Sequence, residues 1–146
     1  MPFFARVLAV LCLASLMTAC TTTGEVLLGN PASLAGTGKA KITTDSEHDH
    51  TILAGLDRRI YITSLDGKSL FRLGATSDYP EGMLLDPGRH EISIRFLHFN
   101  TFANGRLWFV AEREKSYIVR KQMENYSVRL WIEDMLTGRP VGGIVP

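Results

Sequence analysis

From Arg58 onward, apolar and polar residues alternate over short runs that end in turn residues. The run "RRIYITSL" is followed by Asp66 and Gly67, a pair that readily adopts the positive φ angles of a tight hairpin. The run "MLL" leads into "DPGR", where proline and glycine favour a second turn, and "HEISIRF" then alternates strictly. Because alternation with a period of two is typical of half-buried strands, this part of the chain is predicted to be β-structure.

Three further runs, "RLWFVAE", "SYIVRKQM" and "SVRLWIED", continue the pattern, and Thr137 and Gly138 form a turn before "PVGGIV". No helical period of comparable strength occurs in this region. Six or more strands in so short a span predict an all-β fold, a small antiparallel β-sandwich whose core lies between two inward faces. The predicted core residues are Ile60, Ile62, Leu84, Ile92, Ile94, Phe96, Leu107, Phe109, Ile118, Val128, Leu130 and Ile132.

The first residues have the pattern of an export signal. Met1 to Arg6 carry a single positive charge, and Val7 to Leu16 are almost entirely apolar. This apolar run is too short for a permanent transmembrane anchor, which needs roughly 20 residues. We therefore predict a signal helix that is removed by cleavage.

The end of this segment, "LMTAC", resembles the lipobox of bacterial lipoproteins, with small Thr18 and Ala19 before Cys20. Met17 stands where that family usually has leucine. The resemblance implies cleavage of residues 1–19, a diacylglycerol on the Cys20 sulfur and an acylated amine. One acyl chain holds a protein only marginally, whereas several form a stable membrane anchor. The alternative is a secretory cut after Ala19 that leaves a free thiol on Cys20.

Residues 20–50 are rich in threonine, glycine, serine, alanine and proline, and only "EVLL" offers apolar surface. This composition favours a flexible tether, with the folded domain spanning 51–146. Thr21 is not the aspartate that retains lipoproteins of enterobacterial type in the inner membrane. The resemblance therefore implies an anchor at the periplasmic face of the outer membrane.

Charge and cysteine content exclude several kinds of function. The 146 residues include 16 Lys and Arg against 15 Asp and Glu. Because nucleic-acid binding needs an excess of basic residues, this balance predicts that nucleic acid is not a partner. By the lipobox resemblance, Cys12 leaves with the signal and lipid occupies Cys20, which implies that the mature chain has no thiol for a disulfide, catalysis or a metal. We expect no cofactor.

A second resemblance covers roughly Arg58 to Val145. "YITSLDGKSL" followed by "EGMLLDPGRHEISIRF" resembles PEGA-type surface domains and small transthyretin-like modules, and "SYIVR" and "WIEDMLTGRPV" resemble the end of a group of bacterial lipoproteins. The proline-glycine-alanine segment that usually precedes the first strand is absent. The resemblance implies an immunoglobulin- or transthyretin-like sandwich that binds or scaffolds in the envelope, without known catalytic residues.

The segment "SEHDH" gathers two imidazoles and two carboxylates, which are ligands for zinc, copper or nickel. His48 and His50 would share one face of a strand. The alternative is a solvated polar cluster in the tether, because a structural site needs fixed ligands. We predict no metal site and keep these two histidines as weak candidates.

Catalytic groups are weakly indicated. His90 shares a face with Ile92 and Ile94 and is interpreted as a hydrogen-bonded edge residue, because no serine or cysteine has the context of a nucleophile. Glu133 and Asp134 are adjacent and point to opposite sides of a strand, so they are interpreted as strand-end and turn residues. We predict that the protein is not an enzyme.

Two tryptophans and two arginines fall opposite the predicted apolar face: Arg95, Trp108, Arg129 and Trp131. They form either a second apolar layer under a loop such as "HFNTFANG" or a contact surface, since tryptophan and arginine dominate interface hot spots. The first hypothesis is an envelope adaptor that docks a protein partner through a sheet edge or these side chains. The alternative is a module for glycan or peptidoglycan fragments, which a concave aromatic pocket would favour.

Overall fold

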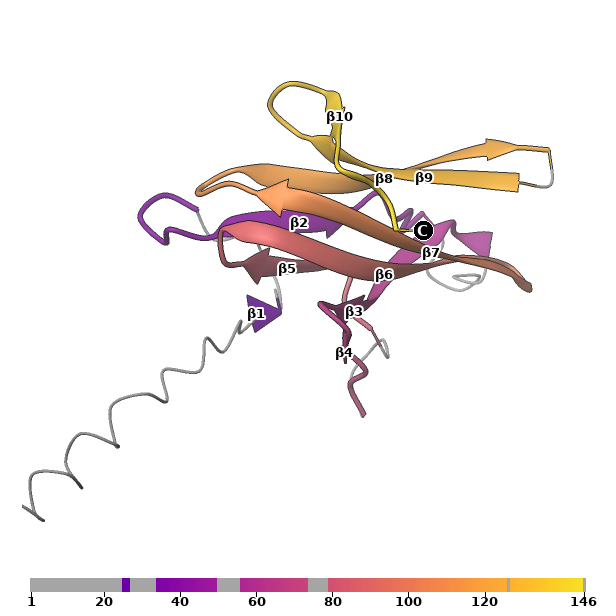
Figure 1. The fold of residues 1–146 in the computed structure, drawn as a ribbon. Coiled ribbons are helices and arrows are strands. Elements are labelled where there is room, and N and C mark those ends of the chain that lie inside the picture. The colour runs from indigo at the N-terminus through magenta and orange to yellow at the C-terminus, as the bar shows by residue number, and fades with distance from the viewer. Residues whose placement is uncertain (1–24, 27–33, 50–55, 74–78, 126, 146) are drawn as a thin grey trace, which may run out of the picture.

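The computed structural model describes residues 25–26, 34–49, 56–73, 79–125 and 127–145. Over these residues the chain is all-β, with eleven strands in two sheets and no α-helix (Figure 1). No helix in these ranges is long and apolar enough to cross a membrane. The predicted signal helix, Cys20 and His50 lie outside the described residues.

The first sheet has six strands in the order β1-β5-β2-β8-β9-β10. Its strands are β1 (Glu25–Val26), β5 (Gly82–Leu85), β2 (Ala40–Thr44), β8 (Ser116–Glu124), β9 (Ser127–Asp134) and β10 (Arg139–Val141). All neighbours are antiparallel except β2 and β8, which run parallel. The sheet is therefore mainly antiparallel, as the turn pattern predicted.

The second sheet has five strands in the order β11-β7-β6-β3-β4, all antiparallel. Its strands are β11 (Gly143–Ile144), β7 (Thr101–Ala111), β6 (Gly88–His98), β3 (Arg59–Leu65) and β4 (Lys68–Ser69). After β10, the C-terminal segment crosses from the edge of the first sheet to β7 in the second (Figure 1). This crossing joins the two sheets along one side.

The hydrophobic core lies between the sheets and takes residues from both. Eight of the predicted core residues are buried there: Ile60, Ile62, Ile92, Ile94, Phe96, Leu107, Phe109 and Ile132. Val128 and Leu130 pack against the core and are partly buried. The alternation in β3, β6 and β7 therefore identified the inward face correctly.

The predicted core positions Leu84 and Ile118 are wrong by one residue. Met83 and Leu85 face the core in β5, and Tyr117 and Val119 face it in β8, each with 0–1% of its surface exposed. Both strands contain consecutive apolar residues, so their sequence pattern does not indicate which face is inward.

The predicted tether, residues 20–50, contains part of the fold. β1 pairs with β5, and β2 lies inside the first sheet between β5 and β8. Ala40 and Ile42 are completely buried. In "AKITT" only two small or medium apolar residues point inward, and both strand partners are distant in sequence, so a local pattern could not reveal this strand. The folded unit therefore begins before residue 51.

Two predicted turns are present. Asp66 and Gly67 have φ angles of 49° and 77° between β3 and β4, as a tight hairpin requires. Asp134 closes the turn after β9, because its Oδ1 accepts hydrogen bonds from the amides of Leu136 and Thr137 at 2.9 and 3.0 Å. The predicted strand-end role of Asp134 is confirmed.

The Asp134 turn makes the stability depend on pH. The hydrogen bond from the Thr137 amide, with that from Leu136 and the Lys115 ammonium, holds the pKa of Asp134 below its usual range despite burial. The unfolded chain therefore binds this proton at a higher pH than the folded chain, and the stabilisation is lost as the pH falls below about 4. We expect Asp134→Asn to flatten the decline of Tm with falling pH in thermal denaturation. An unchanged slope, matching that of the exposed control Glu124→Gln, would contradict this prediction.

Candidate binding groove

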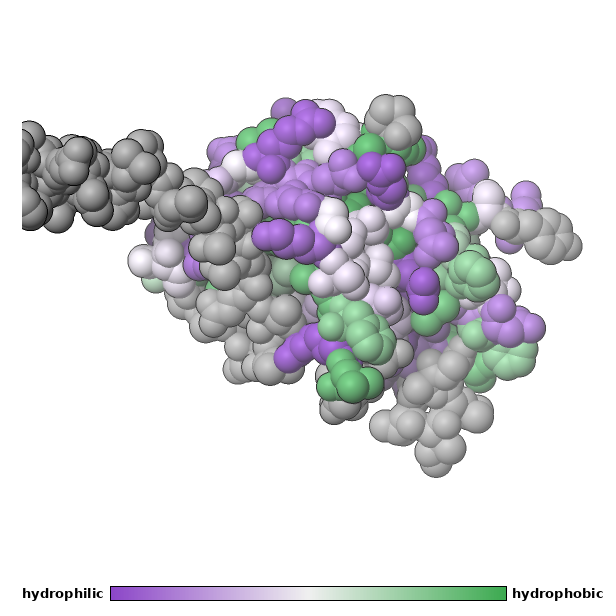
Figure 2. Space-filling model, turned by 60° about the horizontal axis from the view of Figure 1, so that its bottom comes forward, coloured by the Kyte–Doolittle hydropathy of each residue, from purple (hydrophilic) through white to green (hydrophobic). Residues whose placement is uncertain are grey.

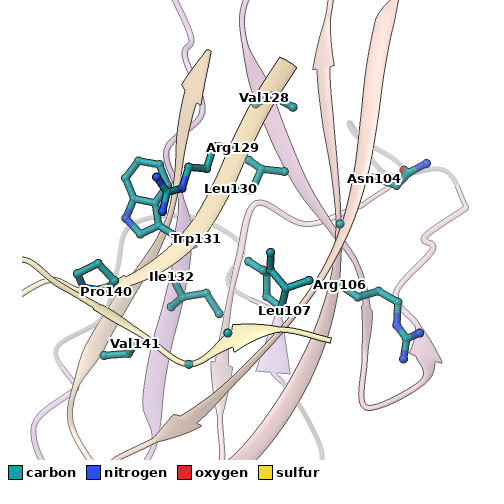
Figure 3. Close-up of a pocket in the computed structure, with 14 residues that line it drawn as sticks. Asn104, Arg106, Leu107, Val128, Arg129, Leu130, Trp131, Ile132, Pro140 and Val141 are labelled. Carbon is teal, nitrogen blue, oxygen red and sulfur yellow. The ribbon is translucent and has the colours of Figure 1, made fainter. Parts of the chain in front are cut away.

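A groove opens between β7 and β9, at the side of the molecule where the two sheets are joined by β10 and β11 (Figure 3). Its volume is about 480 Å³. The branched aliphatic residues that line it are Leu107, Val128, Leu130, Ile132, Val141 and Ile144. The groove is thus an aliphatic opening into the side of the core.

The groove exists because the last two strands are short. β10 pairs with β9 only from Ile132 to Asp134, and β11 pairs with β7 only at Leu107 and Trp108. The Val145 amide extends the second contact by donating to the Arg106 carbonyl at 3.0 Å. In the part of the chain that the structure describes, residues 127–131 and 101–105 have no strand beside them on this side. Two strand edges therefore border the groove.

Hydrogen bonds at the end of β9 show which backbone groups face the open edge. The Met135 amide donates to Ser116 at the start of β8, whereas the Asp134 carbonyl, pointing to the other side, accepts from Gly138. Because successive residues of a strand direct their N–H and C=O groups to alternate sides, the even-numbered residues of β9 face away from β8. The N–H and C=O groups of Val128 and Leu130 therefore point to the open edge.

Arg129 and Trp131 lie at the rim of this groove. Both project from β9 to the side opposite Leu130 and Ile132 (Figure 3). Among the described residues Arg129 forms no ion pair, and the lining contains no aspartate or glutamate. The rim is therefore basic and aromatic over an aliphatic floor.

Trp108 and Arg95 lie elsewhere, on the outer face of the second sheet. The Arg89 guanidinium carbon is 4.3 Å from the centroid of the Trp108 ring, and a Cβ built on Gly143 would lie 3.1 Å from the indole nitrogen. The Arg95 Nε donates to Asn104 Oδ1 at 3.3 Å. The structure thus separates the four predicted contact residues into two pairs, of which only Arg129 and Trp131 line the groove.

The segment "HFNTFANG" is not a loop, contrary to the prediction. His98 ends β6, residues 101–105 begin β7, and only Phe99 and Asn100 form the turn between them. Its inward positions, Ala103 and Gly105, are small, so the segment lacks the apolar alternation that marks a strand. It cannot cover the tryptophans as a layer, because it is itself part of the second sheet.

The exposed hydrophobic side chains outside the groove are scattered. Phe71, Phe99 and Phe102 have 52–69% of their surface exposed, and hydrophobic residues on the face shown in Figure 2 form small groups among hydrophilic ones. Single exposed apolar residues are normal on protein surfaces. Among the described residues, by contrast, the groove brings several apolar side chains together around a hollow.

His48 lies beside an arginine. Its Nε2 is 2.8 Å from Glu81 Oε2, and Arg59 Nε donates to the other oxygen of Glu81 at 2.9 Å. The Arg59 guanidinium is also 3.4 Å from His48 Nδ1, a position that repels a metal cation. Within the described ranges, no three histidine, cysteine, aspartate or glutamate side chains are placed to hold a metal ion.

His90 is buried in the interior strand β6, so its predicted edge position is wrong and its predicted hydrogen bonding is confirmed. Nδ1 lies 2.8 Å from Asp66 Oδ2, and Nε2 lies 2.7 Å from the Asp86 carbonyl oxygen. The ring therefore connects the turn after β3 to the turn before β6. Because both nitrogens are engaged, neither is free to take a proton from a substrate.

Sequence reasoning missed the groove itself. Most of its floor, namely Leu107, Val128, Leu130 and Ile132, comes from residues predicted as core, and its open edge lies where the pairing of β10 and β11 stops. The signal that could have indicated it is "PVGGIV", whose adjacent glycines divide it into two strands too short to cover their neighbours.

Comparison of the chain with protein-family models, with curated proteins and with solved structures found no match in any of the three.

Proposed function

We propose that this protein is a lipid-anchored envelope module that binds a protein partner in the groove between β7 and β9. The anchor is a diacylglycerol on Cys20, supported by the lipobox-like "LMTAC", and the site of action is the periplasmic face of the outer membrane. The two-sheet fold is compatible with the immunoglobulin- or transthyretin-like sandwich of PEGA-type modules.

The observation that carries this proposal is the pair of open strand edges above an aliphatic floor. Extended polypeptides add to such edges through backbone hydrogen bonds, and apolar side chains fill the space beneath. A glycan or peptidoglycan site would instead need aromatic platforms with many polar groups. Trp131 is the one aromatic residue among the 14 that line the groove, so the lining favours protein over sugar.

A non-catalytic role agrees with the chemistry of the described residues. The Asp66 and His90 pair resembles the acid and base of a hydrolase, but His90 Nε2 is occupied by the Asp86 carbonyl. The groove lining carries Asn104, Arg106 and Arg129 as its polar side chains, without a carboxylate or imidazole for proton transfer. These features support binding as the activity.

The test is crosslinking in cells. A photoreactive phenylalanine analogue at position 128 is expected to capture a discrete protein, whereas the same analogue at Val110, an exposed position on the outer face of the second sheet, is not. Cys20→Ala is expected to shift the protein from the membrane to the soluble fraction at least several-fold and to weaken the crosslink. Equal crosslinking from both positions, or unchanged membrane association of Cys20→Ala, would contradict the proposal.

A further inference from the structure

We propose that the groove accepts an extended segment that adds to β9 as a strand, with alternate apolar side chains inward and a carboxylate beside Arg129. This inference rests on the proposed function and specifies the chemistry of its partner. It concerns the open edge of β9, residues 127–131, in line with β10.

The backbone of β9 offers hydrogen bonds at a spacing that suits a strand. The Asp134 carbonyl points away from β8, and every second residue of a strand directs its backbone groups to the same side. Val128 and Leu130 therefore direct their N–H and C=O groups to the open edge. β10 already pairs in this way up to Ile132, opposite Val141, and then leaves toward β7. An added segment would extend the pairing of β9 where β10 ends.

The space beneath the edge suits small or medium apolar side chains. A Cβ built on Gly105 would lie 3.5 Å from Ile94 Cγ1 and 3.8 Å from Leu130 Cδ1, which is ordinary van der Waals contact. A Cβ at position 105 therefore fits between β7 and β9 without steric overlap, on the side of β7 that lines the groove with Leu107. Every second side chain of an added strand points inward, so the segment must be apolar at alternate positions.

Charge determines the remaining positions. Outward side chains of an added strand lie beside those of β9, which are Arg129 and Trp131. Arg106, the other charged residue of the lining, is neutralised by Glu91, whose Oε1 accepts from its guanidinium at 2.6 Å. Arg129 thus remains to pair with a carboxylate of the partner.

The same charge disfavours a second copy of this chain in the groove. If the β9 edges of two copies paired in antiparallel fashion about a two-fold axis, both Arg129 side chains would lie at one seam. Like charges across such a seam repel. A partner segment with acidic outward residues has no such conflict.

The binding experiment uses the full-length chain in detergent and a fluorescein-labelled octapeptide that alternates valine with glutamate. Fluorescence anisotropy is expected to show at least tenfold tighter binding than for the same peptide with lysine in place of glutamate. Arg129→Glu is expected to reverse this preference. Methylation of alternate peptide nitrogens, which removes the edge hydrogen bonds, is expected to abolish binding.

A variant that fills the groove separates binding from folding. Gly105→Val places methyl groups where the inward side chains would lie, so it is expected to weaken peptide binding at least tenfold without lowering Tm. Thr101→Val, an exposed change on the same strand, serves as the matched control. Equal binding of the glutamate and lysine peptides, or full binding by Gly105→Val, would overturn the inference. If peptide binding fails in this way but the crosslink from position 128 still forms in cells, a protein docks in the groove but does not add to β9 as an acidic strand. If the peptide binding and the crosslink both fail, the proposed function is contradicted as well.

Discussion

Ile42→Ala is expected to lower the free energy of unfolding by about 2–5 kcal/mol, the range for truncation of a fully buried isoleucine. Ile42 has no exposed surface and lies in β2, between β5 and β8 in the first sheet. The cost is large because the side chain packs into the core shared by both sheets, where the surrounding residues cannot collapse fully into the cavity.

The measurement is urea denaturation of the full-length chain followed by tryptophan fluorescence. Lys41→Ala is the matched control: it changes the adjacent residue of the same strand, which is not buried, and is expected to change stability by less than about 0.5 kcal/mol. If Ile42→Ala were as neutral as Lys41→Ala, residues 40–44 would belong to the tether, as their composition predicted.

The strands that the sequence predicted well are those whose partners are close along the chain. β6 pairs with β7 over their whole length, of which the alternating pattern predicted all but residues 101–105, and β8 pairs with β9 from Tyr117 to Glu124. A turn and two alternating runs are enough to define such a hairpin. β2 has no neighbour of this kind, since one of its partners, β8, begins at Ser116. Its place depends on non-local pairing, which no local pattern encodes.

The candidate site shows the same limit. Alternation correctly placed Arg129 and Trp131 opposite the apolar residues of β9, and Trp108 opposite those of β7. It could not show that these residues belong to different sheets, because strand order is not a property of either run. The groove also depends on where β10 and β11 stop pairing. The place where their pairing stops is set by the lengths of these strands and by where the chain crosses between the sheets, neither of which a local pattern shows.

Gly142→Ala is the second substitution with a large expected effect, because Gly142 is where the chain crosses from β10 to β11. Its φ is 72°, and a Cβ there would lie 1.8 Å from the backbone oxygen of Trp108. The backbone must therefore move, since no side chain can yield the space. We expect β11 to separate from β7, which would open the end of the groove that β10 and β11 border.

Gly138→Ala measures the backbone strain alone, so the difference between it and Gly142→Ala gives the part of the cost that comes from steric overlap. Gly138 has a similar φ of 66°, but a Cβ there would meet no atom within 4 Å. It is expected to cost about 1–2 kcal/mol, the strain of a left-handed residue. Gly142→Ala is expected to cost at least about 2 kcal/mol more, as breaking a packed backbone contact does. Urea denaturation measures both, and hydrogen exchange should show the Val145 amide, which bonds to Arg106, exposed only in Gly142→Ala. Equal costs would mean that β11 is not held against Trp108, and that the groove is open at both ends.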